Sequence, residues 1–144
     1  MAAPRVVVVG GGGAGDAAAF ALRKRGFDGH VTIISADQDR PYDRPYLSKE
    51  FLRGEIELPK TFLHDEAEYA TQRIELQLNR RVTGGSLSDR KLAIEGGGEI
   101  AFDTLVLGLG KHDAFLAGRR ILRDLENRLH EGAAAINELL QPIA

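Results

Sequence analysis

The chain of 144 residues contains no cysteine and no tryptophan. Without cysteine it has no disulfide bond, no thiol redox pair and no cysteine-ligated metal site, and its four histidines are scattered, so the sequence predicts no metal site. No apolar run approaches the ~20 residues that a membrane-spanning helix needs, and the N-terminus lacks the pattern of a secretory signal. Basic and acidic residues number 19 and 21, so no excess of positive charge indicates nucleic-acid binding. We therefore expect a cytoplasmic globular protein that binds neither nucleic acid nor membrane.

Glycine, by contrast, is concentrated near the N-terminus, between a valine run at 6–9 and an alanine-rich segment of helical character. Gly10, Gly12 and Gly15 have the G-x-G-x-x-G spacing of a strand–turn–helix that holds a pyrophosphate at the helix N-terminus. The alternative is a flexible glycine loop, which the flanking strand and helix patterns disfavour. Asp16, in the first helical turn, would favour the helix dipole but lie near phosphate charge. The residues predicted to hold the pyrophosphate are Gly10, Gly12, Gly13, Ala14 and Gly15.

The next segments extend this pattern. We expect a first strand at 5–9, a helix at 14–25 closed by Gly26, and a second β-branched strand at 30–34. Asp37 follows the second strand, 22 positions after Gly15, close to the spacing of about 20 expected for an acid that binds an adenosine ribose. The alternative for Asp37 is a solvated acid in a strand-end turn.

Two prolines stiffen the loop at 39–46, before a short helical pattern resumes at 47–52. Arg44 and Lys49 are cations on this scaffold, suited to a pyrophosphate and to the electron-rich end of a flavin. The residue types alone fit a packed arginine and a solvated lysine equally well.

Residues 6–55 resemble the FAD-binding domain of the ferredoxin-reductase-like branch of the pyridine nucleotide–disulfide oxidoreductases, and the segment YDRPYLSKEFL at 42–52 is the most specific part of the match. The resemblance implies that Arg44 and Pro45 line the cofactor and that Lys49 approaches the N5 edge of the isoalloxazine ring. It also implies that the Val82 backbone binds the adenine edge, although Val82 is equally compatible with a plain strand residue. Tyr46 stands where a second proline is common in the family.

The remaining pattern gives a helix at 63–72, a strand at 74–78 and three short strands at 80–83, 91–94 and 99–102, separated by glycine turns at 84–86 and 96–98. A final buried strand runs over 103–110. We therefore predict a Rossmann-like three-layer α/β domain: a parallel sheet with helices on one face and a small antiparallel meander on the other.

Beyond this strand, residues 111–144 resemble the last segment of the family's FAD domain, whereas 1–110 resemble the first. We expect one FAD-binding domain over 1–144, an engineered minimal form in which the two segments are joined directly and the NADH and C-terminal domains are absent. Gly110 and Asp113 are the candidates for the flavin side of the site. Asp113 either replaces the family aspartate that holds the ribityl chain or is a helix-start acid.

The resemblance implies a flavoprotein module that binds FAD non-covalently. Because no second G-x-G-x-x-G unit is present to hold a nicotinamide, we expect at most slow flavin redox chemistry. Two alternatives are an NAD- or ADP-binding Rossmann domain, and a scaffold whose flavin site is disrupted by the join. Apolar surface exposed by the missing domains would favour homo-oligomers.

Overall fold

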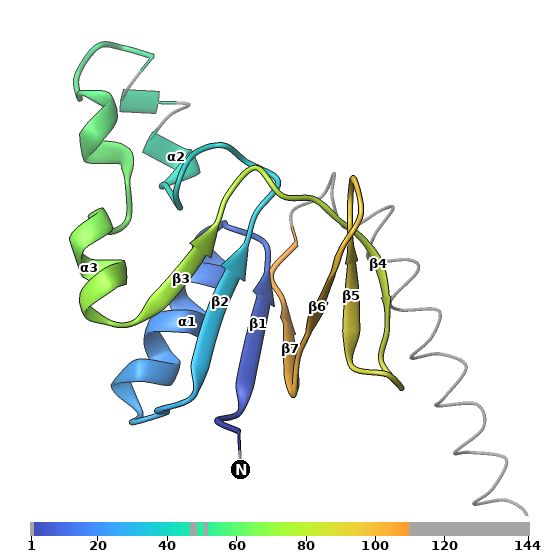
Figure 1. Cartoon of the computed structure of the whole chain (residues 1–144). Coiled ribbons are helices and arrows are strands. Elements are labelled where there is room, and N and C mark those ends of the chain that lie inside the picture. The colour runs from blue at the N-terminus through green and yellow to red at the C-terminus, as the bar shows by residue number, and fades with distance from the viewer. Residues whose placement is uncertain (1, 47–48, 51, 110–144) are drawn as a thin grey trace, which may run out of the picture.

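The computed structural model describes residues 2–46, 49–50 and 52–109. Its centre is a sheet of four parallel strands in the order β3-β2-β1-β7 (Figure 1). These strands are β1 (Arg5–Val9), β2 (His30–Ile34), β3 (Ile74–Gln77) and β7 (Thr104–Leu107). Because all four strands are parallel, their carboxyl ends meet at one edge, where ligands of open α/β sheets bind.

The helices cover one face of this sheet. The helix α1 (Gly13–Lys24) connects β1 to β2, and α3 (Glu66–Thr71) precedes β3. Alternate strand residues point to this face, so Val6 and Val8 of β1 pack with Val31 and Ile33 of β2 under the helices. Val8 and Ile33 have no exposed surface, and they anchor the turn that begins at the end of β1.

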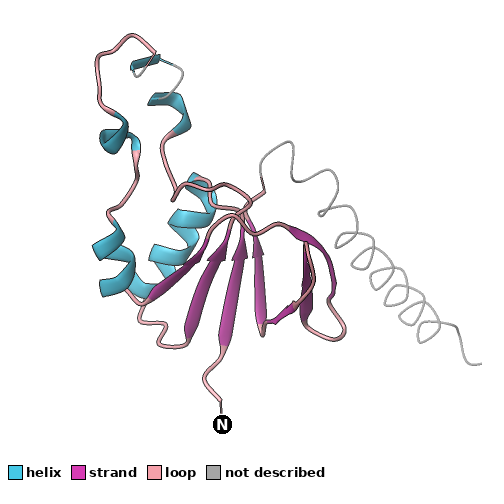
Figure 2. Cartoon of the chain, turned by 45° about the horizontal axis from the view of Figure 1, so that its top comes forward, coloured by secondary structure: helices cyan, strands magenta, loops and turns pink. Residues whose placement is uncertain are grey.

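An antiparallel meander covers the other face (Figure 2). It consists of β4 (Val82–Ser86), β5 (Lys91–Ile94) and β6 (Glu99–Ala101). Val7 and Val9 point toward it and pack with Leu92 and Phe102. Both faces of β1 are therefore buried, which explains its uninterrupted valine run. The predicted three-layer Rossmann-like architecture is confirmed.

The segment between β2 and α3 makes an excursion beyond the carboxyl edge of the sheet (Figure 1). It carries α2 (Arg44–Tyr46) and the 3₁₀ helix η2 (Leu58–Thr61). Its base is closed by backbone hydrogen bonds from Asp43 N to Thr61 O, 2.7 Å, and from Leu63 N to Pro41 O, 3.0 Å. This closure brings Arg44 to the edge where the glycine turn lies.

Arg23, near the end of α1, joins three separate segments through its guanidinium group. It donates to the carbonyl oxygens of Phe27 and Gly29, which precede β2, at 2.7 and 2.8 Å. It also donates to the carbonyls of Gln72 and Arg73, which follow α3, at 2.7 and 2.6 Å. Besides complementing the negative end of the helix dipole, the side chain therefore connects the end of α1 to the segments that precede β2 and β3.

Three sequence predictions need correction. The expected helix at 63–72 is shorter, at Glu66–Thr71. The predicted glycine turn at 84–86 lies within β4, where a Cβ on Gly85 would come within 2.7 Å of the Lys91 carbonyl oxygen. Glycine there permits close strand pairing rather than a turn. The last strand ends at Leu107 and is not buried: Leu107 is 38% exposed, because within the described residues β7 pairs only with β1.

Candidate nucleotide-binding site

Two positions of the turn between β1 and α1, Gly10 and Gly15, require glycine. Gly10 has φ +114°, and a Cβ there would collide with the carbonyl oxygen of Gly108. A Cβ on Gly15 would collide with the carbonyl oxygen of Gly10 and lie 3.1 Å from Val8 Cγ1. Gly10 N donates to the Ile34 carbonyl at 2.8 Å, which ties the turn to the end of β2. The first and third glycines thus allow the turn, β7 and the helix to approach one another.

Two of the glycines between them, Gly12 and Gly13, face open space. A Cβ on Gly12 or Gly13 would meet nothing within 4 Å. Gly12 is the N-cap of α1, and no side chain of the described residues caps the helix there. The first backbone N–H groups of a helix have no partner within it, and they carry its partial positive charge. The start of α1 is therefore accessible and suited to an anion.

A hollow of about 320 Å³ lies at this helix start. We call it the glycine-turn hollow. Arg44 is the charged residue among those that line it, so its guanidinium adds positive charge to that of the helix end. The structure thus brings Arg44 together with three of the five predicted pyrophosphate residues. The lining residues are Gly10, Gly12, Ala14, Arg44, Leu107, Gly108 and Leu109.

Asp37 lies at the same edge of the sheet but does not line the hollow. Its Oδ2 accepts a hydrogen bond from the Tyr42 hydroxyl at 2.9 Å, and its Oδ1 accepts one from Asp39 N at 3.1 Å. Burial, and then the bond to Asp37, raise the pKa of the Tyr42 hydroxyl, so Tyr42 stays a donor. These two bonds orient a half-buried carboxylate that retains capacity to accept others.

The other predicted site residues are placed differently. Val82, at the start of β4, is 5% exposed, and its side chain belongs to the core beneath the meander. Pro45 lies in α2, and it and Lys49 are exposed; neither lines the hollow. Gly110 and Asp113 lie outside the described residues, so their roles stay predictions.

Two contributions to the site were not predicted from the sequence. Gly110 was the candidate at the end of the last strand, whereas Gly108 is the residue that lies against Gly10 and Gly15. A signal was available: β7 is parallel to β1, so the residue that follows its end must lie beside the glycine turn. Tyr42, the partner of Asp37, comes from a loop whose conformation no periodicity predicts.

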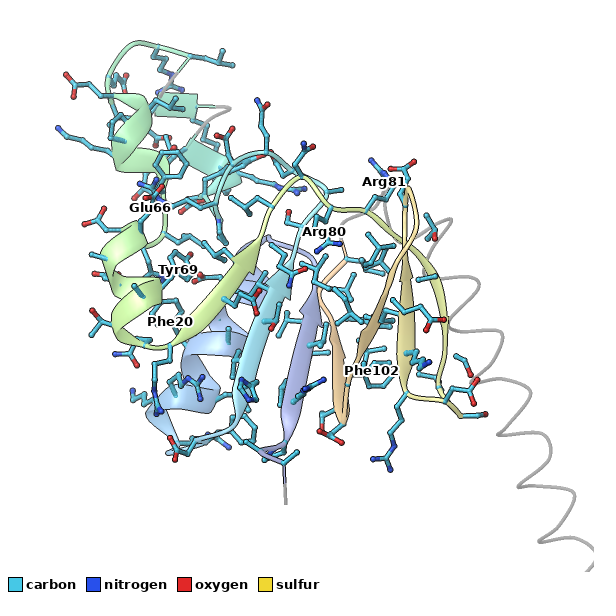
Figure 3. The ribbon with its side chains drawn as sticks, in the orientation of Figure 1. Phe20, Glu66, Tyr69, Arg80, Arg81 and Phe102 are labelled. Atoms are coloured by element: carbon cyan, nitrogen blue, oxygen red, sulfur yellow. The ribbon has the colours of Figure 1, made fainter. Side chains whose placement is uncertain are left out.

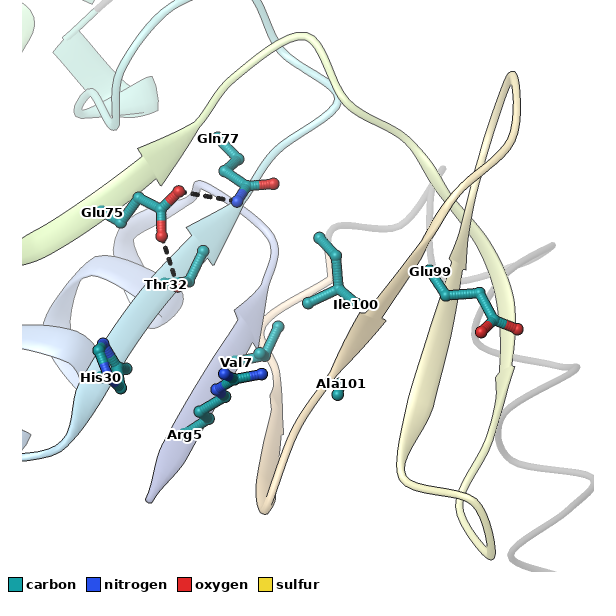
Figure 4. A pocket seen from close by; sticks show the side chains of 9 residues that line it. All are labelled: Arg5, Val7, His30, Thr32, Glu75, Gln77, Glu99, Ile100 and Ala101. Atoms are coloured by element: carbon teal, nitrogen blue, oxygen red, sulfur yellow. Dashed lines mark hydrogen bonds between the residues drawn. The ribbon is translucent and has the colours of Figure 1, made fainter. Parts of the chain in front are cut away.

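A second hollow, of about 330 Å³, lies on the meander side of the parallel sheet (Figure 4). Polar and apolar residues line it, and several of the polar side chains already have partners. Glu75 accepts hydrogen bonds from Thr32 Oγ1 at 3.1 Å and from Gln77 Nε2 at 2.8 Å, and Glu99 is paired with Lys91 at 2.9 Å. Unlike the glycine-turn hollow, this one is not lined by the start of a helix.

Within the described part of the chain, no helix has both the length and the apolar character needed to cross a bilayer. Nor do three or more His, Asp or Glu side chains gather there in a group that could hold a metal ion.

Comparison with known proteins identifies the family to which the chain is similar. A sequence model described as pyridine nucleotide-disulphide oxidoreductase matches residues 4–139. The ferredoxin–NAD(+) reductase component of the biphenyl dioxygenase system of Paraburkholderia xenovorans is 35% identical, over 95% of this chain and 34% of the relative. Terpredoxin reductase of a Pseudomonas species is 40% identical, over 77% of this chain and 27% of the relative.

The solved structures agree with the sequence relatives. A covalent putidaredoxin reductase–putidaredoxin complex superposes with a TM-score of 0.73 at 32% identity, covering 76% of this chain and 26% of that chain. The present chain thus spans about a quarter to a third of the length of the proteins it matches. The resemblance inferred from the sequence is confirmed: the chain belongs to the pyridine nucleotide–disulphide oxidoreductase family.

Proposed function

We propose that this chain is a non-covalent FAD-binding module. One observation carries the proposal: the glycine-turn hollow combines the uncapped start of α1, open backbone at Gly12 and Gly13, and the Arg44 side chain. These groups fit a pyrophosphate, which needs close approach of the main chain and positive charge. A bound flavin would supply the redox chemistry, because it can accept two electrons together and release them one at a time.

Each residue has a distinct part in this proposal. The Gly12–Ala14 backbone and Arg44 bind the pyrophosphate, and Asp37, oriented by Tyr42, accepts hydrogen bonds from the adenosine ribose. The Val82 backbone binds adenine and Lys49 approaches the flavin edge, as the family resemblance implies. Gly110 and Asp113 complete the ribityl side.

The sharpest test is Gly12→Asp, which separates binding from folding. Position 12 has room for the side chain, and aspartate is a preferred N-cap, so the apo protein should be at least as stable as the wild type. The new carboxylate would occupy the phosphate position with negative charge. FAD affinity, measured by fluorescence titration and by the ligand-induced rise in Tm, should fall by roughly 100-fold or more. Wild-type-like binding by Gly12→Asp would contradict the proposal.

A second pair of variants tests Arg44. Arg44→Ala should weaken FAD binding about tenfold or more, since it removes the charged lining residue. Arg25→Ala removes an exposed cation from the opposite end of the same helix and is the matched control, which should bind FAD as the wild type does. Equal affinities in the two variants would exclude Arg44 from the site.

Comparing FAD with ADP and NAD separates the proposal from its alternatives. FAD should bind more tightly than ADP if the flavin side of the site forms. Equal affinity for FAD and ADP would support an adenosine-binding domain only, whereas no binding of any of the three would support a scaffold. The ferredoxin–NAD(+) reductase relatives also suggest NADH as electron donor, and we expect this chain alone to oxidise NADH slowly.

A further inference from the structure

A buried carboxylate lies directly behind the glycine turn. Asp16 follows Gly15 in the first turn of α1, and only 3% of its surface is exposed. Its Oδ1 accepts a hydrogen bond from the Tyr69 hydroxyl of α3 at 2.5 Å, and its Oδ2 lies 3.0 Å from His64 Nδ1. Within the described residues, the partners of Asp16 are thus a tyrosine of α3 and a histidine of the segment that precedes α3.

The two partners differ in what they can do. Burial, and then the bond to Asp16, raise the pKa of the Tyr69 hydroxyl, so Tyr69 remains a neutral donor. Histidine, by contrast, changes charge between about pH 5 and pH 8. The His64 side chain is 30% exposed, which allows proton exchange with solvent. Of the two partners of Asp16, histidine is therefore the residue type that can carry a positive charge.

The ring of His64 is held in place from several sides. It stacks on Phe20 of α1, with ring centroids 3.7 Å apart and planes 16° from parallel. Phe20 in turn meets the Tyr69 ring edge-on. Figure 3 labels Phe20 on α1 and Tyr69 on α3. His64 Nε2 lies 4.0 Å from a Glu68 carboxylate oxygen. Arg40 donates to the His64 carbonyl at 3.0 Å and lies 3.7 Å from Glu66. The charged groups around His64 are thus three carboxylates, Asp16, Glu66 and Glu68, and one guanidinium, Arg40.

The position of Asp16 gives its charge a consequence. Asp16 lies in the first turn of α1, the turn whose start lines the glycine-turn hollow through Gly12 and Ala14, and helical side chains lean toward the helix N-terminus. A buried charge is weakly screened, and its field opposes a pyrophosphate at the helix start. When His64 carries a proton, the pair is neutral and this opposition is removed.

We propose that the Asp16–His64 pair sets the affinity of the glycine-turn hollow for its anionic ligand, and that the ligand binds more tightly when His64 is protonated. The inference rests on the proposed FAD-binding function and assigns His64 as a positioning residue, which acts on the ligand through Asp16. By reciprocity, ligand binding must then increase proton occupancy at His64.

The test is the pH dependence of FAD affinity between about pH 5.5 and pH 8, the range in which histidine titrates. We expect the wild-type Kd to rise roughly five- to tenfold across this range. Calorimetry in buffers of different ionisation enthalpy should show proton uptake at intermediate pH. His64→Gln should keep the weaker, high-pH affinity throughout, and Asp16→Asn should keep the tighter one. Both variants should lose the pH dependence.

The controls separate a charge effect from damage to the fold. His30→Gln removes an exposed histidine at the amino end of β2, far along the strand from the hollow, and should retain the full pH dependence. Tyr69→Phe keeps the Asp16–His64 pair and should also retain it, even where stability is lost. Wild-type binding that is independent of pH, or pH dependence that persists in His64→Gln, would overturn this inference while leaving FAD binding intact. Absence of wild-type FAD binding at every pH would overturn both proposals.

Discussion

The packing of α1 against the glycine turn leads to a prediction that needs no ligand. At Gly15, an added Cβ would press on the Gly10 carbonyl oxygen and on Val8 Cγ1. At Gly13, two residues earlier in the same helix, an added Cβ would meet nothing within 4 Å. The same substitution, glycine to alanine, should therefore have opposite effects at the two positions.

The magnitudes follow from the nature of the obstacle. Backbone cannot rotate aside as a side chain can, so Gly15→Ala must shift α1 or β1; overpacking of this kind costs about 1–3 kcal/mol or more. The better helix propensity of alanine offsets about 1 kcal/mol. Because the obstacle is backbone, we take the upper end of this range, which leaves a net loss of roughly 2 kcal/mol in the free energy of unfolding, or roughly 4–8 °C in Tm. Gly13→Ala should instead gain about 0.5–1 kcal/mol.

Urea unfolding of the two apo variants, followed by far-ultraviolet circular dichroism, checks this prediction, since the chain has no tryptophan to report by fluorescence. Unfolding midpoints should move in opposite directions with an unchanged dependence on urea. If both variants lose stability equally, or Gly13→Ala loses more, the close approach at Gly15 does not determine the stability of the turn.

Two further predictions concern the helix layer. Arg23→Ala should cost about 2–3 kcal/mol of stability, because four carbonyl oxygens lose a charged donor. The control is Lys24→Ala, which removes an exposed neighbouring cation and should change stability by less than about 0.5 kcal/mol in urea unfolding. Equal losses in the two variants would show that the carbonyl contacts contribute little. Tyr69→Phe should lose about 1.5–3 kcal/mol at neutral pH through its bond to buried Asp16. Because burial raises the pKa of the folded Tyr69 hydroxyl, its stabilisation is present below the ordinary tyrosine pKa of about 10 and falls as pH rises above it. The difference between wild type and Tyr69→Phe should accordingly narrow as the pH rises above about 10 in alkaline unfolding, and a constant difference would contradict the assigned bond.

The local sequence pattern was sufficient to predict the bounds of the central strands and of the first helix. The strands predicted at 5–9 and 30–34 have those bounds, and the first helix differs by one residue at each end. These elements are buried on both faces or amphipathic with clear end signals, so residue order reports their environment. The turn predicted at 84–86 was wrong, because glycine occurs both in turns and where two strands pair closely, as in β4.

The candidate site was predictable only where a motif coincides with an element end. Gly10, Gly12 and Ala14 line the hollow as the motif implies, and Arg44 joins them as the family resemblance implies. The Asp16–His64–Tyr69 contacts were not predictable, because they join residues about 50 positions apart whose spacing has no period. Exposure of β7 likewise depends on which neighbours a strand acquires, which apolar content does not encode.

The pairing of β7 with β1 has a consequence for biosynthesis. Arg5 N donates to Asp103 Oδ2 at 2.7 Å across 98 positions of sequence, and Gly108 rests against the first glycine of the turn. During synthesis, α1, β1 and β2 can therefore pack together early, whereas the edge of β1 that pairs with β7 stays unpaired until residues 104–107 have been synthesised. Under the proposed function, the cofactor would bind only after Gly108 has been synthesised, because Gly108 lines the glycine-turn hollow.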